Sequence, residues 1–367
     1  MYIDHTLFGN SGLSGEERFL AETTIFVGTI AMTSAPFPVI SSPSQGSPVA
    51  LVLGAAGGVG GAVARTLLAH GWRVRALTRH PETAARSVGL DRVEWVAGDA
   101  MAAAEVAAAA AGARLLFHGV NPPRYRNWRG LAIPMLANAI AAAKAAGARL
   151  VFPGNVYNFG PDAGAVIDEH TPQHPLTRKG AIRVEMEAML REAARDGLRS
   201  LIVRAGDYFG GHAPGSWFQN AMVKPGRPLR AITYPGVPEV GHSWAYLPDL
   251  GEAVARLAAI EARLAAFDCI HFEGHWLPHG IAMAEAVRRA AGDPTLPIRR
   301  FPWPLLPLAA PLVPMLREVL EMRYLWQRPL RLDNRKLVAL IGPEPRTPLD
   351  DAVRRSLEEL RCLAAPP

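Results

Sequence analysis

A pair of cations at the start of a predicted helix could bind or polarise an oxygen atom. Lys179 and Arg183 are four residues apart in the segment PLTRKGAIRVEME, residues 175–187, so they share one helical face. Thr177, just before them, is typical of a helix cap. Positive charge in a first helical turn opposes the helix dipole and costs about 0.3–1 kcal/mol per charge. This cost favours a functional role for the pair over a solvated helix start.

A glycine turn, GAAGGVG at residues 54–60, is the second motif with a chemical meaning. A short apolar run at 49–53 precedes it, apolar positions at helical spacing follow it, and an alternating run at 72–78 comes next. In a strand–turn–helix–strand unit, glycines let backbone N–H groups approach a pyrophosphate at the helix N-terminus. The sequence therefore predicts a dinucleotide site. The residues predicted to form the turn around the cofactor are Gly54, Gly57, Gly58, Val59 and Gly60.

The end of the second predicted strand indicates which dinucleotide is bound. Enzymes that use NAD usually place an acidic residue about twenty residues after the glycines. The stretch ALTRH at 76–80 has no acid and carries Arg79 instead. Because a guanidinium can bind a 2′-phosphate, the sequence favours NADP over NAD.

Strand and helix patterns alternate from residue 48 onward, which positions these motifs at one edge of a sheet. Strands are predicted at 93–97, 114–119, 148–152 and 199–204, and helices at 101–111, 131–146 and 180–196. Strands separated by helices give a parallel sheet covered on both faces. The predicted fold is thus an α/β fold, a Rossmann-type doubly wound parallel sheet with a smaller C-terminal substrate-binding region. The predicted divisions are a flexible N-terminal extension at 1–47, an NAD(P)-binding domain at 48–205 completed by about 241–265, and a substrate-binding region at 206–240 and 266–361.

The glycine spacing and several later segments resemble the short-chain dehydrogenase/reductase superfamily, in its extended and atypical branch of NAD-dependent epimerase/dehydratase-like proteins. The fragment GD that ends at Asp99 resembles the acid that contacts adenine in this family. FHGVN, ending at Asn121, resembles the fourth-strand segment under the cofactor, and VFPGNVY, ending at Tyr157, resembles the fifth strand. The resemblance covers residues 49–265 well and the C-terminal hundred residues loosely.

The same resemblance places Lys179 and Arg183 where the family carries a Tyr-x-x-x-Lys pair. In the family the tyrosine is the general acid/base, and the lysine anchors the nicotinamide ribose. The usual Ser/Thr of the fifth strand falls near residues 153–154, Pro-Gly, and is missing as well. The resemblance therefore implies an altered catalytic site, in which Arg183 binds the ribose and Lys179 donates a proton to the substrate oxygen. Asn155 and Tyr157 are implied as contacts to substrate or cofactor.

Two functions of different class stay open. One is an NADP(H)-dependent oxidoreductase or epimerase that acts on a small carbonyl or hydroxyl compound, which the cationic pair and the long substrate region favour. The other is a non-catalytic NAD(P)-binding regulator or redox sensor, which the loss of the tyrosine favours. The aromatic residues that could line a substrate cleft or pack in the core are Trp217, Tyr234, Trp276 and Trp303.

Composition narrows the class of partner. Of 367 residues 49% are hydrophobic and 20% charged, which is ordinary for a soluble globular enzyme. The net charge is +6, yet the arginines form no basic run, so an anionic small molecule is a better partner than nucleic acid. A homodimer is compatible with this composition.

Cysteine, histidine and hydropathy patterns argue against a disulfide-rich protein, a membrane-spanning protein and a metal-binding site. Two cysteines cannot form a disulfide framework, which fits a reducing cytoplasm. No apolar run reaches the length of a membrane-spanning helix. Three histidines, His271, His275 and His279, are four apart, but Gly274 and Pro278 interrupt any helix there, so no metal site is predicted.

Overall fold

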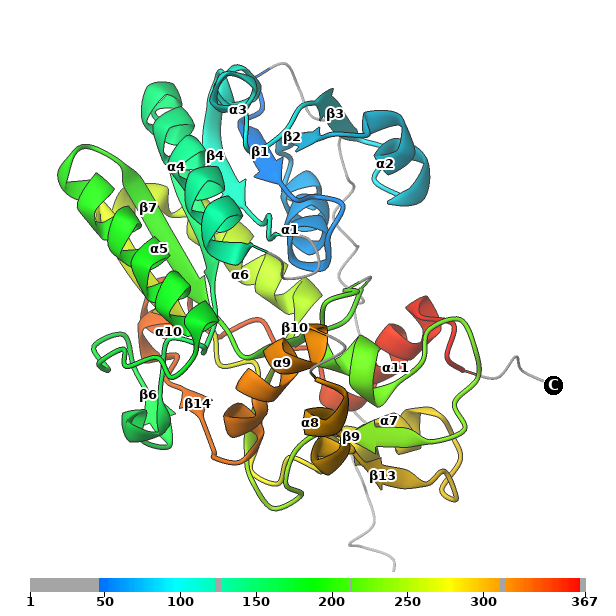
Figure 1. Ribbon diagram of the computed structural model, residues 1–367. Coiled ribbons are helices and arrows are strands. Elements are labelled where there is room, and N and C mark those ends of the chain that lie inside the picture. The colour runs from blue at the N-terminus through cyan, green and yellow to red at the C-terminus, as the bar shows by residue number, and fades with distance from the viewer. Residues whose placement is uncertain (1–45, 123–126, 212, 311–313, 364–367) are drawn as a thin grey trace, which may run out of the picture. The chain divides into compact units, whose positions relative to one another are not determined.

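The computed structural model describes residues 46–122, 127–211, 213–310 and 314–363 (Figure 1). The predicted N-terminal extension therefore lies almost entirely outside the described residues.

The centre of the fold is a seven-stranded sheet in the order β11-β7-β5-β4-β1-β2-β3, with every neighbouring pair parallel. The strands are β1 Val49–Leu53, β2 Arg73–Thr78, β3 Val93–Ala97, β4 Ala113–His118, β5 Arg149–Gly154, β7 Arg199–Arg204 and β11 Phe267–His271. Both faces are covered, which explains why β1 and the middle of β7 read as nearly continuous apolar runs. The strand order reverses between β1 and β4, and that switch point creates a crevice at the carboxyl edge of the sheet.

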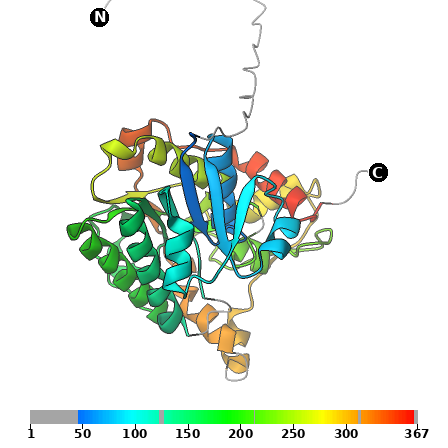
Figure 2. The ribbon, with the colours of Figure 1, turned by 90° about the horizontal axis from the view of Figure 1, so that it is seen from above.

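Helices pack on both faces of the sheet, as Figure 2 shows from above. On one face lie α1 Gly58–Ala69, α6 Leu247–Ala259 and α10 Arg335–Ile341. On the other lie α3 Ala103–Ala110, α4 Trp128–Ala146 and α5 Arg178–Arg195. The short α2, Pro81–Ser87, follows β2. The predicted fold class is confirmed, and the predicted helices and strands of this half agree with the observed ones to within a few residues.

The strand β11 differs from the expected division of the chain. The sequence assigned residues from 266 onward to the substrate-binding region, whereas β11 pairs in parallel with β7 at the edge of the central sheet. The reason is that its buried positions, among them Ile270, continue the core of the sheet. Helix α10, also assigned to the substrate-binding region, packs Leu337 against the same core.

The remaining elements form a smaller region that gathers below the sheet in Figure 1. Its strands are β8 Asp207–Phe209, β10 His242–Tyr246 and β12 His275–Leu277 in one sheet, β9 Ile232–Tyr234 with β13 Ile298–Arg300, and β6 Val166–Ile167 with β14 Arg331–Leu332. Its helices are α7 Ala282–Ala290, α8 Leu306–Ala309, α9 Pro314–Glu321 and α11 Leu349–Glu359. Most of these elements share a separate hydrophobic core with several buried aromatic rings.

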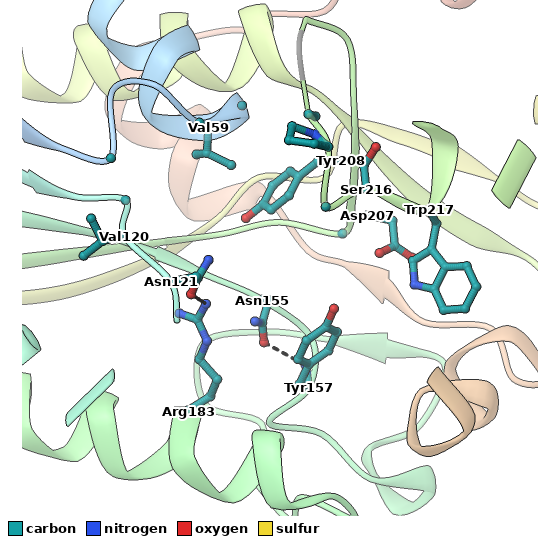
Figure 3. A pocket seen from close by; sticks show the side chains of 18 of the residues that line it. Val59, Val120, Asn121, Asn155, Tyr157, Arg183, Asp207, Tyr208, Ser216 and Trp217 are labelled. Carbon is teal, nitrogen blue, oxygen red and sulfur yellow. Dashed lines mark hydrogen bonds between the residues drawn. The ribbon is translucent and has the colours of Figure 1, made fainter. Parts of the chain in front are cut away.

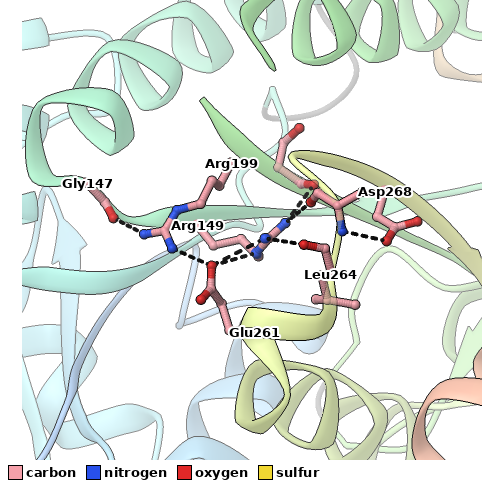
Figure 4. A network of polar contacts seen from close by, with 8 residues as sticks. Gly147, Arg149, Arg199, Glu261, Leu264 and Asp268 are labelled. Atoms are coloured by element: carbon pink, nitrogen blue, oxygen red, sulfur yellow. Dashed lines mark hydrogen bonds and ion pairs between the residues drawn. The ribbon is translucent and has the colours of Figure 1, made fainter. Parts of the chain in front are cut away.

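A network around two arginines, of which Arg149 is buried, links elements at the opposite, amino edge of the sheet (Figure 4). Arg149 on β5 is 2% exposed, and its guanidinium donates to Glu261 Oε1 and to the carbonyl oxygen of Ala265, the latter at 2.9 Å. Arg199 on β7 donates to the same Glu261 oxygen at 2.5 Å. These contacts tie the segment after α6 to two strands. The network therefore holds these elements together, while the crevice of the switch point lies at the carboxyl edge.

Candidate cofactor and substrate site

Two adjoining cavities occupy the carboxyl edge of the sheet. The main cavity, of about 400 Å³, opens between the loops that follow β1, β4, β5 and β7 (Figure 3). The second, of about 300 Å³, lies over the ends of β2 and β3 and shares Gly54, Val120 and Asn121 with the first. Together they form one elongated site. Its two ends suit either the two halves of a dinucleotide or a cofactor at one end and a substrate at the other.

The glycine turn is shaped for close backbone approach. Gly54 has a φ of +85°, and a Cβ there would lie 2.6 Å from the carbonyl oxygen of Gly119. A Cβ on Gly60 would lie 2.3 Å from the carbonyl oxygen of Gly54, so α1 packs directly on the turn. The N-cap of α1 is Gly57, and no side chain caps the helix. Free N–H groups at a helix N-terminus suit a pyrophosphate, so the residues present fit a dinucleotide. Gly58 and Val59 line the main cavity beside them.

The second cavity brings together two residues that the sequence predicted as cofactor contacts. Arg79 lines it from an exposed position after β2, and Asp99 lines it from the loop after β3. The Oδ1 atom of Asp99 accepts a hydrogen bond from the backbone N–H of Met101 at 2.9 Å, which orients the carboxylate. A 2′-phosphoadenosine half of a cofactor would meet a cation and an acid here.

Helix α5 presents Arg183 to the main cavity. Thr177 caps the helix as predicted, with its hydroxyl oxygen accepting the N–H of Gly180 at 3.0 Å. The Arg183 guanidinium donates to Asn121 Oδ1 at 3.1 Å and to the carbonyl oxygen of Pro153 at 3.3 Å. Asn121 lies between both cavities, so the pair Asn121–Arg183 stands at the middle of the elongated site (Figure 3).

Lys179 lies in the first turn of the same helix, but its position differs from that of Arg183. It is 4% exposed, so it is not a solvated helix-start lysine. It is absent from the described residues that line the main cavity. The next residue, Gly180, packs so closely that a Cβ would lie 2.2 Å from the carbonyl oxygen of Tyr157. The first turn thus lies against the Tyr157 loop, and the role of Lys179 as proton donor stays a prediction.

Asn155 and Tyr157 both line the main cavity, and a buried ion pair holds their loop. The Asn155 side-chain oxygen accepts the N–H of Tyr157 at 3.0 Å. Behind the loop, the Arg204 guanidinium donates to the Asn155 carbonyl oxygen at 2.6 Å and to Glu187 Oε2 at 2.7 Å. Both ionic side chains are almost fully buried, at 1% and 3% exposure. The loop conformation therefore depends on a charge pair inside the fold.

The structure adds residues that the sequence reasoning did not single out. Asp207 and Tyr208 follow β7 directly and line the main cavity with Ser216. The Tyr208 hydroxyl donates to the carbonyl oxygen of Gly154 at 3.2 Å, and burial raises the pKa of Tyr208 to about 12. The signal that could have found them is their place at the carboxyl end of a predicted strand, where ligands bind in open parallel sheets.

Of the four aromatic residues named from the sequence, one lines the main cavity. Trp217 lies there beside Asp207 (Figure 3). Tyr234 and Trp303 are buried in the core of the smaller region, and the Trp303 indole donates to the Pro235 carbonyl oxygen at 2.6 Å. These two rings have a packing role.

Two of the three histidines considered for a metal site lie on different strands, since His271 ends β11 and His275 begins β12. Burial lowers the pKa of His271 to about 3 and that of His275 to about 4. Within the described ranges, no cluster of three or more histidine, cysteine, aspartate or glutamate side chains could hold a metal ion. None of the described helices combines the length and the apolar run that crossing a bilayer requires.

Comparisons with known proteins agree with this geometry. Residues 54–213 match a family model described as NAD(P)H-binding. No curated protein matches the sequence.

The fold is similar to those of solved sugar-nucleotide epimerases. UDP-glucose-4-epimerase from Stenotrophomonas maltophila, solved with NAD and formylated UDP-arabinopyranose, aligns at 16% identity and a TM-score of 0.67, covering 86% of this chain and 98% of that one. UDP-glucose 4-epimerase from Bifidobacterium longum, solved with NAD+ and UDP, aligns at 16% identity with a TM-score of 0.65. The alignment covers 85% of this chain and 97% of that one. UDP-glucuronic acid 4-epimerase from Bacillus cereus aligns at 14% identity with a TM-score of 0.65. The alignment covers 85% of this chain and 99% of that one.

These findings confirm the resemblance drawn from the sequence at the level of fold and cofactor domain. The chain has a Rossmann-type fold similar to that of these solved epimerases, and its residues 54–213 match an NAD(P)H-binding family model.

Proposed function

We propose that the protein is an NADP(H)-dependent oxidoreductase or epimerase that acts on a small carbonyl or hydroxyl compound. The observation that carries this proposal is the elongated site itself. The glycine turn and Arg79 stand at its cofactor end, while Asn155, Tyr157 and Asp207 stand beyond Arg183 at the other end. A cofactor-binding regulator would not need the second, partly polar end.

The preference for NADP rests on Arg79. A guanidinium can hold a 2′-phosphate through charge-assisted hydrogen bonds worth roughly 1.5–3 kcal/mol. We expect calorimetry to show NADPH binding at least tenfold more tightly than NADH, and Arg79→Ala to remove most of the difference. Arg73→Ala is a matched control, because Arg73 is an exposed arginine at the amino end of the same strand. Equal affinities in the wild type would refute the preference.

Within the cavity, each residue has a proposed task. A bound nicotinamide would supply or accept hydride at the substrate end. Arg183, held by Asn121, would bind the ribose, since an arginine has no accessible neutral form and serves only as a donor. Lys179 would place positive charge near the alkoxide that develops as a carbonyl is reduced. Asn155 and Tyr157 would contact the substrate.

Catalysis is tested by offering the NADPH-loaded protein a panel of ketones, aldehydes and enones. UDP-glucose and UDP-glucuronic acid belong in the panel, because the solved relatives include their epimerases; their conversion is followed by chromatography. Oxidation of NADPH with a defined compound, or conversion of a sugar nucleotide, supports the proposed enzymatic function.

The second candidate, a redox sensor, is favoured by the missing tyrosine. Tight NADPH binding with no turnover, together with a cofactor-dependent change in shape, would support that candidate.

A further inference from the structure

A carboxylate–imidazole pair at the substrate end has no role in the assignments above. Asp207 begins β8 and lines the main cavity (Figure 3), while His242 begins β10 behind it. The His242 Nε2 atom lies 2.8 Å from Asp207 Oδ2, and the two side chains are 9% and 15% exposed. A buried ion pair contributes little net stability, because desolvation offsets the attraction. Stability alone therefore does not explain the pair.

The surrounding packing fixes the orientation of the imidazole. The His242 ring stacks on Trp326 with centroids 3.9 Å apart and an angle of 8° between the planes. It also contacts the Trp244 ring at 5.2 Å. Strand β10 is locked to β8 in a parallel register that pairs Trp244 with Asp207. A carboxylate held through a fixed imidazole is a preorganised group, as catalysis requires.

Of the other ionisable groups that line the cavity, Tyr157 is assigned above to substrate contact, and Tyr208 and Arg183 are less suited to proton exchange. The Tyr208 hydroxyl is engaged with the Gly154 carbonyl, and burial raises its pKa to about 12. Arg183 has no accessible neutral form. Among the described residues that line the cavity, Asp207 is the only carboxylate. The altered site lacks the tyrosine of related enzymes and needs a different group to move a hydroxyl proton.

We propose that Asp207 is the catalytic residue that exchanges the substrate hydroxyl proton, and that His242 is the residue that positions it and shares its proton; this inference rests on the proposed function. During oxidation of an alcohol, the O–H proton would pass to the free oxygen of the Asp207 carboxylate, and a bound oxidised nicotinamide would supply the hydride acceptor for the C–H electron pair. The Nε2–H of His242 donates to the other carboxylate oxygen throughout, and the proton on the free oxygen of Asp207 passes to solvent as the product leaves. Reduction of a carbonyl follows the same steps in reverse.

The proton transfer takes place among several titratable groups. Tyr208 and Tyr234 face Asp207 from β8 and β9, and burial together with the Asp207 charge raises the pKa of both phenols. Both therefore stay neutral at physiological pH. Arg183 contributes a fixed positive charge from α5, on the side of the cavity near Asn121.

The test compares Asp207→Asn with wild type in the same NADPH-oxidation panel, and with the corresponding alcohols and NADP+. We expect kcat/KM to fall at least about a hundredfold, the usual scale of a lost general acid or base, with the NADPH dissociation constant changed less than twofold. Asp207→Glu, which keeps the carboxylate, should restore part of the rate. Matched controls are Asp162→Asn and His174→Gln, because these residues form an exposed pair at 2.6 Å and are expected to leave the rate unchanged.

The role of His242 has its own readouts. His242→Gln should change the shape of the pH profile of kcat/KM, whereas a purely structural defect would lower the rate by the same factor at every pH. Proton NMR without cofactor should show a downfield resonance of the shared proton that both His242→Gln and Asp207→Asn remove.

Three results would overturn the proposal. If Asp207→Asn keeps more than a third of wild-type kcat/KM, Asp207 is not the residue that exchanges the hydroxyl proton. The proposed function would remain intact. A loss confined to Lys179→Met would assign the proton to the lysine instead. Absence of turnover with every compound, despite measured NADPH binding, would overturn the oxidoreductase function and this inference together.

Discussion

The variant Arg204→Met tests whether the buried ion pair behind the cavity determines both stability and cofactor-site geometry. Removing the guanidinium leaves the Glu187 carboxylate buried, at 2% exposure, with Gln173 Nε2 still donating to its Oε2 atom at 2.8 Å. It also removes the donor to the Asn155 carbonyl oxygen at 2.6 Å. Breaking a buried pair by deleting one partner typically costs about 3–5 kcal/mol, because an uncompensated charge stays buried. For a chain of this size, that corresponds to a fall in Tm of roughly 4–7 °C.

Denaturant unfolding followed by fluorescence measures the loss, and calorimetry with NADPH measures the effect on the site. The double variant Glu187→Gln with Arg204→Met should recover most of the stability, since no unpaired charge stays buried. Arg195→Met is the matched control, because its pair with Glu192 on the same helix is 72% and 71% exposed and should contribute under about 1 kcal/mol. A loss below about 1 kcal/mol in Arg204→Met would refute the reasoning.

Four further variants test separate features. Lys179→Met should bind NADPH normally and lose about a hundredfold in turnover, whereas Arg183→Met should weaken NADPH binding, both measured by calorimetry and initial rates. Gly60→Ala should abolish NADPH binding, because its Cβ would lie 2.3 Å from the Gly54 carbonyl oxygen; unchanged affinity would exclude the turn as the pyrophosphate site. Burial lowers the pKa of His118 from 6.5 to about 3. The unfolded chain therefore binds this proton first, and the stability that neutral His118 contributes is full above about pH 6.5 and lost as pH falls toward 3. When Tm is measured as a function of pH, His118→Phe should reduce the fall in Tm between about pH 6.5 and pH 3.

Local patterns predicted the sheet well, because each strand and helix of the cofactor half carries its own signal. The apolar run at 49–53, the glycine turn and the strand at 199–204 all lie within a few residues of where they were expected. The partner of a strand is not a local property. Strand β11 follows a long excursion through the smaller region, and its five residues do not reveal which sheet they join.

In the candidate site too, residues in local motifs were predicted from the sequence, whereas contacts between distant segments were not. Arg183, Asn155 and Tyr157 were predicted from motifs, and all three line one cavity. The Asp207–His242 contact joins residues 35 positions apart through the pairing of β8 with β10. Two short strands of a small sheet have too few residues for their pairing to be read from the sequence. The contact therefore required coordinates.

The way the chain passes between the central sheet and the smaller region limits how the protein can move. Only Ala205 and Gly206 separate β7 from β8, α6 begins directly after β10, and residues 272–274 separate β11 from β12. A hinge needs a few free backbone torsions in every connecting segment, and these three short connections cross at the same edge. We therefore expect little rigid-body opening between the two parts. Access to the cavity then depends on the surface loops, and a ligand meets a site whose shape is largely set before it arrives.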